Sequence, residues 1–132
     1  MLSWKIHRAL INAKLEPFLG FLHSVQYSKP SLVCDFLEFY RCLTDDFVIQ
    51  YCRNIKSKDF VTKTEDLSRE KKGKRVYLND GRTKALMKEL SGFFESEIEV
   101  QRTRVGKKQT IETLVGEEAL LFAGYLRNEQ KT

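Results

Sequence analysis

The chain has 132 residues, of which 42% are hydrophobic and 31% are charged, as in an ordinary globular domain. Its net charge of +5 permits an anionic partner such as nucleic acid without requiring one. No apolar run approaches the roughly 20 residues that a membrane-spanning helix needs, and no signal peptide opens the sequence. We therefore expect one soluble intracellular domain rather than a membrane or secreted protein.

Apolar residues at helical spacing predict a first helix over residues 2–14. Trp4 lies on this helix and is expected to be a core residue rather than a stacking platform for bases. Pro17 and Gly20 then end the helix and turn the backbone, which places His23 in a loop.

A long central helix is predicted from Leu32 to about Ile55, because apolar residues recur there every three or four positions. Pro30 and Ser31 precede it as a start signal, since a serine hydroxyl can accept hydrogen bonds from backbone N–H groups two or three residues later. The helix carries all three cysteines of the chain, Cys34, Cys42 and Cys52. Their spacing shows neither a CxxC pair nor a disulfide framework, so we expect reduced thiols in or near the core.

The second half of the chain predicts a minor β ribbon and two further helices. Residues 59–62 (DFVT) and 75–78 (RVYL) have the composition of short strands, and the polar segment between them is expected to be a mobile charged loop. Helices are predicted over residues 82–95 and 109–127. The apolar side of the last helix is expected to comprise Ile111, Leu114, Val115, Leu121, Phe122, Tyr125 and Leu126. The predicted fold class is therefore all-α, a compact multi-helix domain with one long central helix and a minor two-stranded β ribbon.

His23 and two acids on the central helix have the composition of half a divalent-metal site. Asp35 and Glu38 are three residues apart, so both project from one helical face near its N-terminal end. By spacing alone, surface hydrogen bonding or helix capping explains the same residues, because the helix dipole favours an acid there. For Asp35 three roles stay open: metal ligand, orienter of His23, or stabiliser of the helix end.

Basic residues suggest where an anionic partner could bind. Arg41 is fixed on the central helix, where it could orient acids or phosphate. A second group has no acid among its members and consists of Arg102, Arg104, Lys107 and Lys108. This group, and the cluster over residues 71–75, either tracks a DNA backbone or is solvated surface.

Three segments together resemble one family: LEPFLGFLHS at 15–24, KPSLVCDFLEFYR at 29–41 and GKRVYLNDGRTKALMKEL at 73–90. They are similar to the C-terminal helical catalytic domain of the CRISPR-associated spacer integrase. That family is a metal-dependent DNA endonuclease that inserts new spacers into CRISPR arrays during antiviral defence. The resemblance runs from about Leu2 to Asn128, and its most specific part is the fixed spacing between the first two segments.

The resemblance implies roles for individual residues. In the family, one histidine and acids on the following helix, with a glutamate from an earlier helix, hold a catalytic Mn²⁺ or Mg²⁺. His23 matches the motif histidine, Glu38 matches an acid that binds the metal, and Asp35 matches the acid beside it. Arg41 matches the arginine that closes the motif, and Cys42 stands where family members often have proline.

Two family features have no match here: the glutamate of the earlier helix and the N-terminal β domain that builds the dimer. The resemblance therefore implies that residues 1–132 correspond to the C-terminal α-helical catalytic domain, as a fragment or truncated homologue without the β domain. We expect an incomplete metal site and little or no nuclease activity from the isolated chain.

By resemblance, the protein is expected to be a cytoplasmic prokaryotic enzyme that cuts and joins DNA phosphodiesters with Mn²⁺ or Mg²⁺. Its full-length relatives are expected to act on double-stranded DNA as homodimers, together with a small ferredoxin-like CRISPR adaptation protein and without a membrane partner. The alternative is a non-catalytic helical module that keeps the fold and binds DNA or protein.

Overall fold

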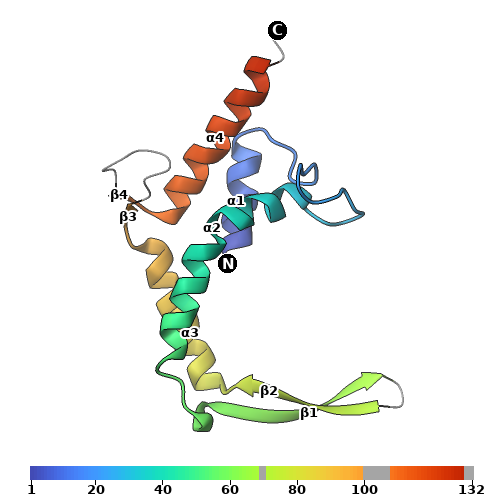
Figure 1. The fold of residues 1–132 in the computed structure, drawn as a ribbon, viewed down its shortest axis with the longest axis vertical. Helices are drawn as coiled ribbons and strands as arrows, with labels where there is room; N and C mark the ends of the chain where they lie inside the picture. Colours follow the sequence, from blue (N-terminus) through green and yellow to red (C-terminus); the bar gives the residue numbers. More distant parts are fainter. Residues whose placement is uncertain (69–70, 100–107, 130–132) are drawn as a thin grey trace. The chain divides into compact units, whose positions relative to one another are not determined.

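The computed structural model describes residues 1–68, 71–99 and 108–129 (Figure 1). The chain divides into a first unit, Met1–Thr44 with Phe94–Thr132, and a second unit, Asp45–Phe93. Its elements in chain order are α1 (Leu2–Asn12), α2 (Ser31–Cys52), the short 3₁₀ helix η1 (Ser57–Asp59), β1 (Phe60–Ser68), β2 (Lys71–Leu78), α3 (Asp80–Glu95), β3 (Ile98–Glu99), β4 (Lys108–Gln109) and α4 (Ile111–Glu129).

The prediction of an all-α fold with one long central helix is wrong. The described residues form four α-helices and two antiparallel two-stranded sheets, β1–β2 and β3–β4, so the fold mixes both kinds of element. Helix α2 has 22 residues and α4 has 19, so no single helix dominates. The helices themselves begin and end close to their predicted positions, because apolar spacing reports a helix directly.

The core of the first unit forms where α1 packs against α4. On α1, Leu2, Ile6 and Leu10 recur every four residues and are buried. Helices α2 and α4 contribute the buried apolar residues Leu32, Val33, Phe36, Tyr40, Ile111, Leu114, Val115, Ala119 and Ala123. Burial of one large aliphatic or aromatic side chain stabilises the fold by about 1.5–3 kcal/mol. Because this core holds both α1 and α2, the two ends of the loop between them are fixed.

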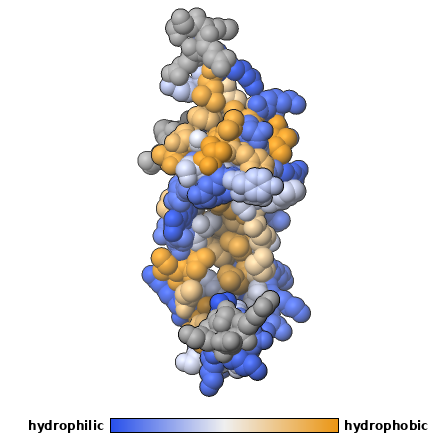
Figure 2. Space-filling model, turned by 90° about the vertical axis from the view of Figure 1, so that its right-hand side faces the viewer, coloured by the Kyte–Doolittle hydropathy of each residue, from blue (hydrophilic) through white to orange (hydrophobic). Residues whose placement is uncertain are grey.

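Apolar side chains also lie on the surface of the first unit (Figure 2). The prediction of a buried Trp4 is wrong: this side chain is 65% exposed and stacks on His7, with ring centroids 6.0 Å apart. The second half of α4 is likewise less buried than predicted, since Leu121 and Tyr125 are 65% and 57% exposed. Periodicity identifies the apolar face of a helix but not how much of that face another element covers. No helix among the described residues is long and apolar enough to cross a membrane.

The cysteines on α2 are all free thiols. Cys34 is half-buried, whereas Cys42 and Cys52 are exposed. The expectation of packed thiols therefore holds only for Cys34, because the later turns of α2 have less of their surface covered.

The second unit is held together by the end of α2 and by α3. Phe47 and Phe93 stack with ring centroids 5.0 Å apart. Tyr51 is 8% exposed, and its hydroxyl donates a hydrogen bond to the backbone carbonyl of Arg82 at 3.2 Å. These contacts hold the end of α2 against α3.

Two polar side chains attach the base of the β1–β2 ribbon to α3. Asp59 accepts hydrogen bonds from the backbone N–H of Lys56 at 2.8 Å and pairs with the Arg82 guanidinium at 3.1 Å. Asn79 Oδ1 accepts from the backbone N–H of Arg82 at 2.8 Å, which caps the start of α3. The backbone N–H of Asn79 in turn donates to the carbonyl of Asp59 at 2.8 Å.

The β1–β2 ribbon is longer than predicted. Strands were expected at residues 59–62 and 75–78, but residues 63–68 and 71–74 of the polar segment predicted as a loop continue them, in antiparallel register. Asp66 lies opposite Lys72, and such cross-strand pairs of opposite charge stabilise a ribbon. The composition of a polar segment does not reveal this pairing, which depends on the register of the two strands.

Candidate functional site

The loop over residues 15–30 is tied to the start of α2 by its backbone. The Leu32 N–H donates to the carbonyl of Pro17 at 3.0 Å. Ser31 is fully buried, and its hydroxyl donates to the carbonyls of Ser24 at 3.1 Å and Lys29 at 3.3 Å. The sequence correctly predicts a helix start at Ser31, but the hydroxyl acts as a donor that holds the preceding loop rather than as an acceptor that caps the helix.

Asp35, on the first turns of α2, is the centre of this junction. Its side chain is fully buried. Oδ2 accepts hydrogen bonds from the backbone N–H groups of Phe21 at 2.6 Å and Leu22 at 3.1 Å, and Oδ1 accepts from that of His23 at 2.9 Å. A buried carboxylate is stable only when its oxygens are satisfied in this way, so Asp35 and the loop backbone hold each other in place.

Gly20 allows the loop to come this close. A Cβ atom at Gly20 would lie 2.7 Å from Asp35 Oδ2 and 2.7 Å from the Cβ of Ser31. Both distances are well below van der Waals contact, and neither neighbour is the flexible end of a long side chain. The sequence marks Gly20 only as a turn residue; its steric role depends on a carboxylate 15 residues further along the chain.

The ring of His23 is oriented by the same carboxylate. Nδ1 of His23 lies 2.6 Å from Asp35 Oδ1, and the His23 side chain is 34% exposed. An ionised carboxylate can only accept a hydrogen bond, so Nδ1 carries the proton. In the neutral ring this leaves Nε2 with a lone pair, which is the arrangement that metal-binding histidines show when a carboxylate orients them.

The hydrogen bonds decide the charge of Asp35. Burial by itself raises the pKa of a carboxyl group, but the bonds from the His23 ring and from three backbone N–H groups outweigh that effect and hold the pKa of Asp35 below its ordinary value. Asp35 is therefore a carboxylate at neutral pH. Because all four of its bonds come from the protein, its geometry suits the orienting role better than direct metal binding.

Glu38 lies one turn further along α2 and has a different environment. Its side chain is 45% exposed and pairs with Arg41, whose Nη1 lies 3.3 Å from Oε1. Both residues line a cavity of about 250 Å³ together with Leu2, Leu37 and Thr44. His23 does not line this cavity. The structure thus brings His23 and Asp35 together directly, and it places Glu38 beside Arg41 instead.

His23 and Glu38 are residue types that bind divalent cations, but two side chains are too few to complete a coordination sphere. An imidazole nitrogen and an exposed carboxylate are ordinary ligands for Mn²⁺, and Mg²⁺ is commonly held by one or two carboxylates with waters and substrate phosphates. Among the residues that the structure describes, however, no group of three or more His, Cys, Asp or Glu side chains is placed to hold a metal ion. His23 and Glu38 would therefore supply only part of a coordination sphere.

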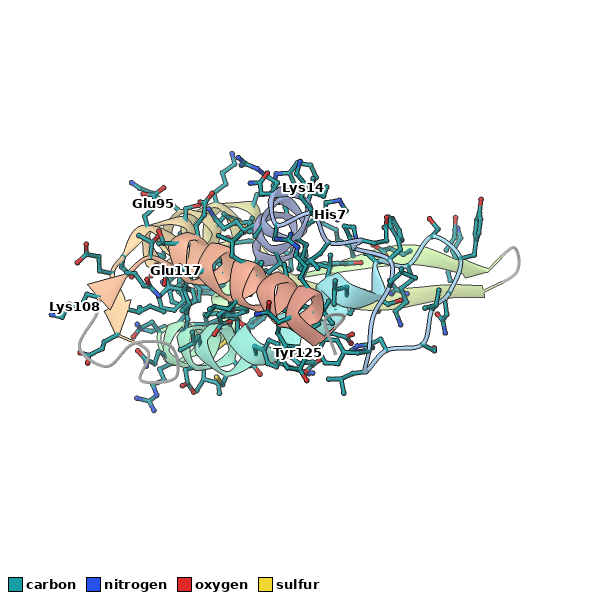
Figure 3. The ribbon with its side chains drawn as sticks, turned by 90° about the horizontal axis from the view of Figure 1, so that it is seen from above. His7, Lys14, Glu95, Lys108, Glu117 and Tyr125 are labelled. Carbon is teal, nitrogen blue, oxygen red and sulfur yellow. The ribbon has the colours of Figure 1, made fainter. Side chains whose placement is uncertain are left out.

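The structure describes only some of the basic residues that were predicted to bind an anionic partner. Arg102, Arg104 and Lys107 lie outside the described residues. Lys108 is exposed on β4 (Figure 3). Arg41 is exposed as well, and it pairs with Glu38 on the same helix.

A further cavity was not expected from the sequence. It has a volume of about 320 Å³ and is lined by Phe21, Phe36, Phe39, Phe122 and Glu118. Glu118 accepts a hydrogen bond from the hydroxyl of buried Tyr40. Helical periodicity places Phe36 and Tyr40 on the apolar side of α2, but it carries no signal for a carboxylate on α4 that meets them.

Comparison with known sequences gives a consistent result. The family model for CRISPR associated protein Cas1 matches residues 1–91. A CRISPR-associated endonuclease Cas1 from Francisella tularensis subsp. novicida is 44% identical over 62 residues, which are 46% of this chain and 20% of that protein. A CRISPR-associated endonuclease Cas1 from Chlorobaculum tepidum is 30% identical over 132 residues, which are 98% of this chain and 36% of that protein.

Solved structures agree at the level of the fold. A casposase bound to an integration product superimposes with a TM-score of 0.74 and 25% identity, covering 99% of this chain and 36% of that one. A CAS1 protein from Thermotoga maritima gives a TM-score of 0.71 at 18% identity, covering 97% of this chain and 38% of that one. At that identity the second likeness concerns the fold alone.

The matches cover between 15% and 43% of the length of the curated relatives. The matched family model covers more than half of this chain, including the whole His23–Asp35 junction. The chain belongs to the CRISPR associated protein Cas1 family.

Proposed function

We propose that this chain forms part of the catalytic centre of a CRISPR-associated DNA integrase and endonuclease, in which His23 and Glu38 bind Mn²⁺ or Mg²⁺ and Asp35 positions His23. The observation that carries the proposal is the buried Asp35 carboxylate, which lies 2.6 Å from His23 Nδ1 and leaves Nε2 for a ligand. Curated relatives named as endonucleases, and a casposase bound to an integration product, support the reaction class.

The bound cation would supply Lewis-acid stabilisation of charge on the DNA phosphate during cutting and joining. The chain's own residues position the side chains that would bind the cation. Asp35 holds the His23 ring in one tautomer, and the backbone of the loop holds Asp35. Arg41 holds the Glu38 carboxylate on the surface of α2 and adds a positive charge beside it. The remaining ligands would come from outside the described residues, from water or from the DNA phosphate.

The partners follow from the same proposal. Double-stranded DNA is the proposed substrate, and a homodimer that binds a small CRISPR adaptation protein is the proposed assembly. Solved structures of similar fold bear on the assembly: one is a partial Cas6-RT-Cas1–Cas2 complex, with a TM-score of 0.77 and 18% identity. This likeness concerns the fold alone. Co-purification of this chain with a small CRISPR adaptation protein would test the assembly.

Mn²⁺ binding to the full 132-residue chain tests the proposed site without relying on activity. Titration followed by the electron paramagnetic resonance signal of free Mn²⁺ should show weak binding that His23→Ala and Glu38→Gln each reduce by at least about tenfold. Asp35→Asn should reduce it by about 10–100-fold, because an oriented histidine binds metal better than a free one. His7→Ala is the matched control, since it removes the other histidine of the chain. Equal losses from His7→Ala and His23→Ala would refute the assignment.

A non-catalytic DNA-binding module is the second candidate, and the exposed basic β1–β2 ribbon is the observation that favours it. Under this alternative, affinity for DNA is the same with and without Mn²⁺ and does not change in Glu38→Ala. Under the catalytic proposal, Mn²⁺ raises the affinity for DNA ends and Glu38→Ala removes that increase.

A further inference from the structure

The described side chains of the β1–β2 ribbon are exposed or half-buried on both faces. No described residue of β1 or β2 is buried, although the two strands have nine and eight residues. Among the described residues, the hydrogen bonds and ion pair that attach it to α3 lie at its base and involve Asp59 and Asn79. The ribbon extends away from that helix (Figure 1). An isolated two-stranded ribbon is marginally stable in water, so one this long gains from a partner that binds along it.

The register assigns the ribbon's charges to its faces. Residues directly opposite each other share a face, and the face alternates along each strand. Lys63 and Arg75 are opposite each other on one face, and Lys72 and Lys74 lie on the other. Each strand therefore carries cations, and so does each face.

The acids of the ribbon are engaged within it. Glu65 accepts a hydrogen bond from the Tyr77 hydroxyl at 2.5 Å and lies 3.5 Å from Arg75 Nη1. Asp66 is opposite Lys72 in the register. The described side chains of the ribbon thus comprise four cations against two acids, and both acids already face a cation. An exposed surface with this balance suits an anionic partner.

We propose that the β1–β2 ribbon binds duplex DNA by entering the major groove, with its lysines on the phosphates of the two flanking backbones. The major groove of B-form DNA is about 12 Å wide and admits a two-stranded ribbon. Cations on both faces match a groove that has phosphates on both sides. A second copy of the ribbon is a poor occupant, because the positive charges of the two copies would repel. This inference rests on the proposed function for its choice of DNA, and it names a surface separate from the His23–Asp35 junction.

Two matched triple variants of the full chain test the proposal. The first, Lys63→Gln with Lys72→Gln and Lys74→Gln, removes three charges from the ribbon. The control removes three exposed charges from α3 and the turn after α2, in the same unit, and its substitutions are Arg53→Gln, Lys84→Gln and Lys88→Gln. Binding to a duplex DNA is measured by fluorescence anisotropy over a range of salt concentrations. EDTA is present throughout, so the outcome does not depend on the proposed metal site.

The ribbon triple should lower the slope of log K against log salt by about 2–3, because each lost phosphate contact removes about 0.9. Its affinity at about 0.1 M salt should fall by at least about tenfold, and the control slope should change by less than about one. Unchanged circular dichroism and thermal midpoints show that both variants fold. Equal losses in the two triples would overturn the proposal even if the Mn²⁺ site were correct.

Binding to duplex RNA and competition by polyglutamate distinguish binding in the major groove from general attraction to anions. The major groove of an A-form RNA duplex is too deep and narrow for the ribbon, so the ribbon triple should change binding to duplex RNA no more than the control triple does. Polyglutamate, which stands for an acidic protein, should compete for the chain far less well than duplex DNA at equal charge. An equal effect of the ribbon triple on RNA and DNA would overturn groove binding, and so would equal competition by polyglutamate.

Discussion

At the junction of the 15–30 loop with α2, a fully buried carboxylate is satisfied by four hydrogen bonds, whereas no charged side chain described on the β1–β2 ribbon is buried. The junction uses one charge to fix backbone and ring geometry. The ribbon presents several charges to solvent, where each contributes little to folding and remains available for a partner. The comparison predicts that substitutions at the junction change stability and ring geometry, while substitutions on the ribbon change binding.

Asp35→Asn should have the largest effect on stability. The amide can accept at only one atom, so its NH₂ group would face N–H donors that the carboxylate now satisfies. We expect the free energy of unfolding to fall by about 2–4 kcal/mol, measured by urea denaturation. Asp46→Asn, at an exposed position of the same helix, should change it by no more than about 0.5 kcal/mol. Similar values for the two variants would show that Asp35 is not the centre of the junction.

Gly20→Ala should have the next largest effect. The added methyl group would meet Asp35 Oδ2 and Ser31, so the loop must move away from the carboxylate. A loss of about 1–3 kcal/mol is expected from thermal or urea unfolding. Gly116→Ala on α4 is the control, since an added Cβ there meets nothing within 4 Å and alanine favours a helix by about 1 kcal/mol. Stabilisation of the protein by both alanines would show that Gly20 is not needed to make room for the Asp35 carboxylate.

Asp59 should give a smaller effect that depends on pH. The hydrogen bond from the Lys56 backbone and the pairing with Arg82 lower the pKa of Asp59 in the folded protein. Its stabilisation is therefore complete above the unfolded value of about 3.9 and is lost as the pH falls through the lower folded pKa. Thermal midpoints measured from about pH 5 down to about pH 2 should fall less steeply in Asp59→Asn than in the wild type. Parallel curves would show that Asp59 does not stabilise the base of the ribbon.

Much of the helical part could be predicted from sequence. Leu2, Ile6 and Leu10 give α1, and similar spacing gives the other three helices to within a few residues. The long ribbon could not be predicted, because its polar residues form strands through a register that composition does not specify. Trp4 was misplaced for a related reason: an apolar residue on a helix is buried only if another element covers it.

The sequence singles out candidate residues for the site but not their geometry. Spacing and family resemblance selected His23, Asp35 and Glu38 together. Spacing could not tell that Asp35 is buried beneath the loop while Glu38, three residues later, is exposed beside Arg41. That difference depends on how the 15–30 loop folds over the first turn of α2, and on Gly20, whose missing side chain makes room for it.

The tautomer of His23 tests most directly the claim that Asp35 orients this ring so that Nε2 can bind a metal ion. Long-range ¹H–¹⁵N NMR on the neutral imidazole distinguishes a protonated Nδ1 from a protonated Nε2. The account predicts that His23 carries its proton on Nδ1, that Asp35→Asn shifts the ring toward a mixture of tautomers, and that His7 is unchanged in that variant. A His23 ring protonated on Nε2 in the wild-type protein would contradict the account, because Nε2 would then not be available to bind a metal ion.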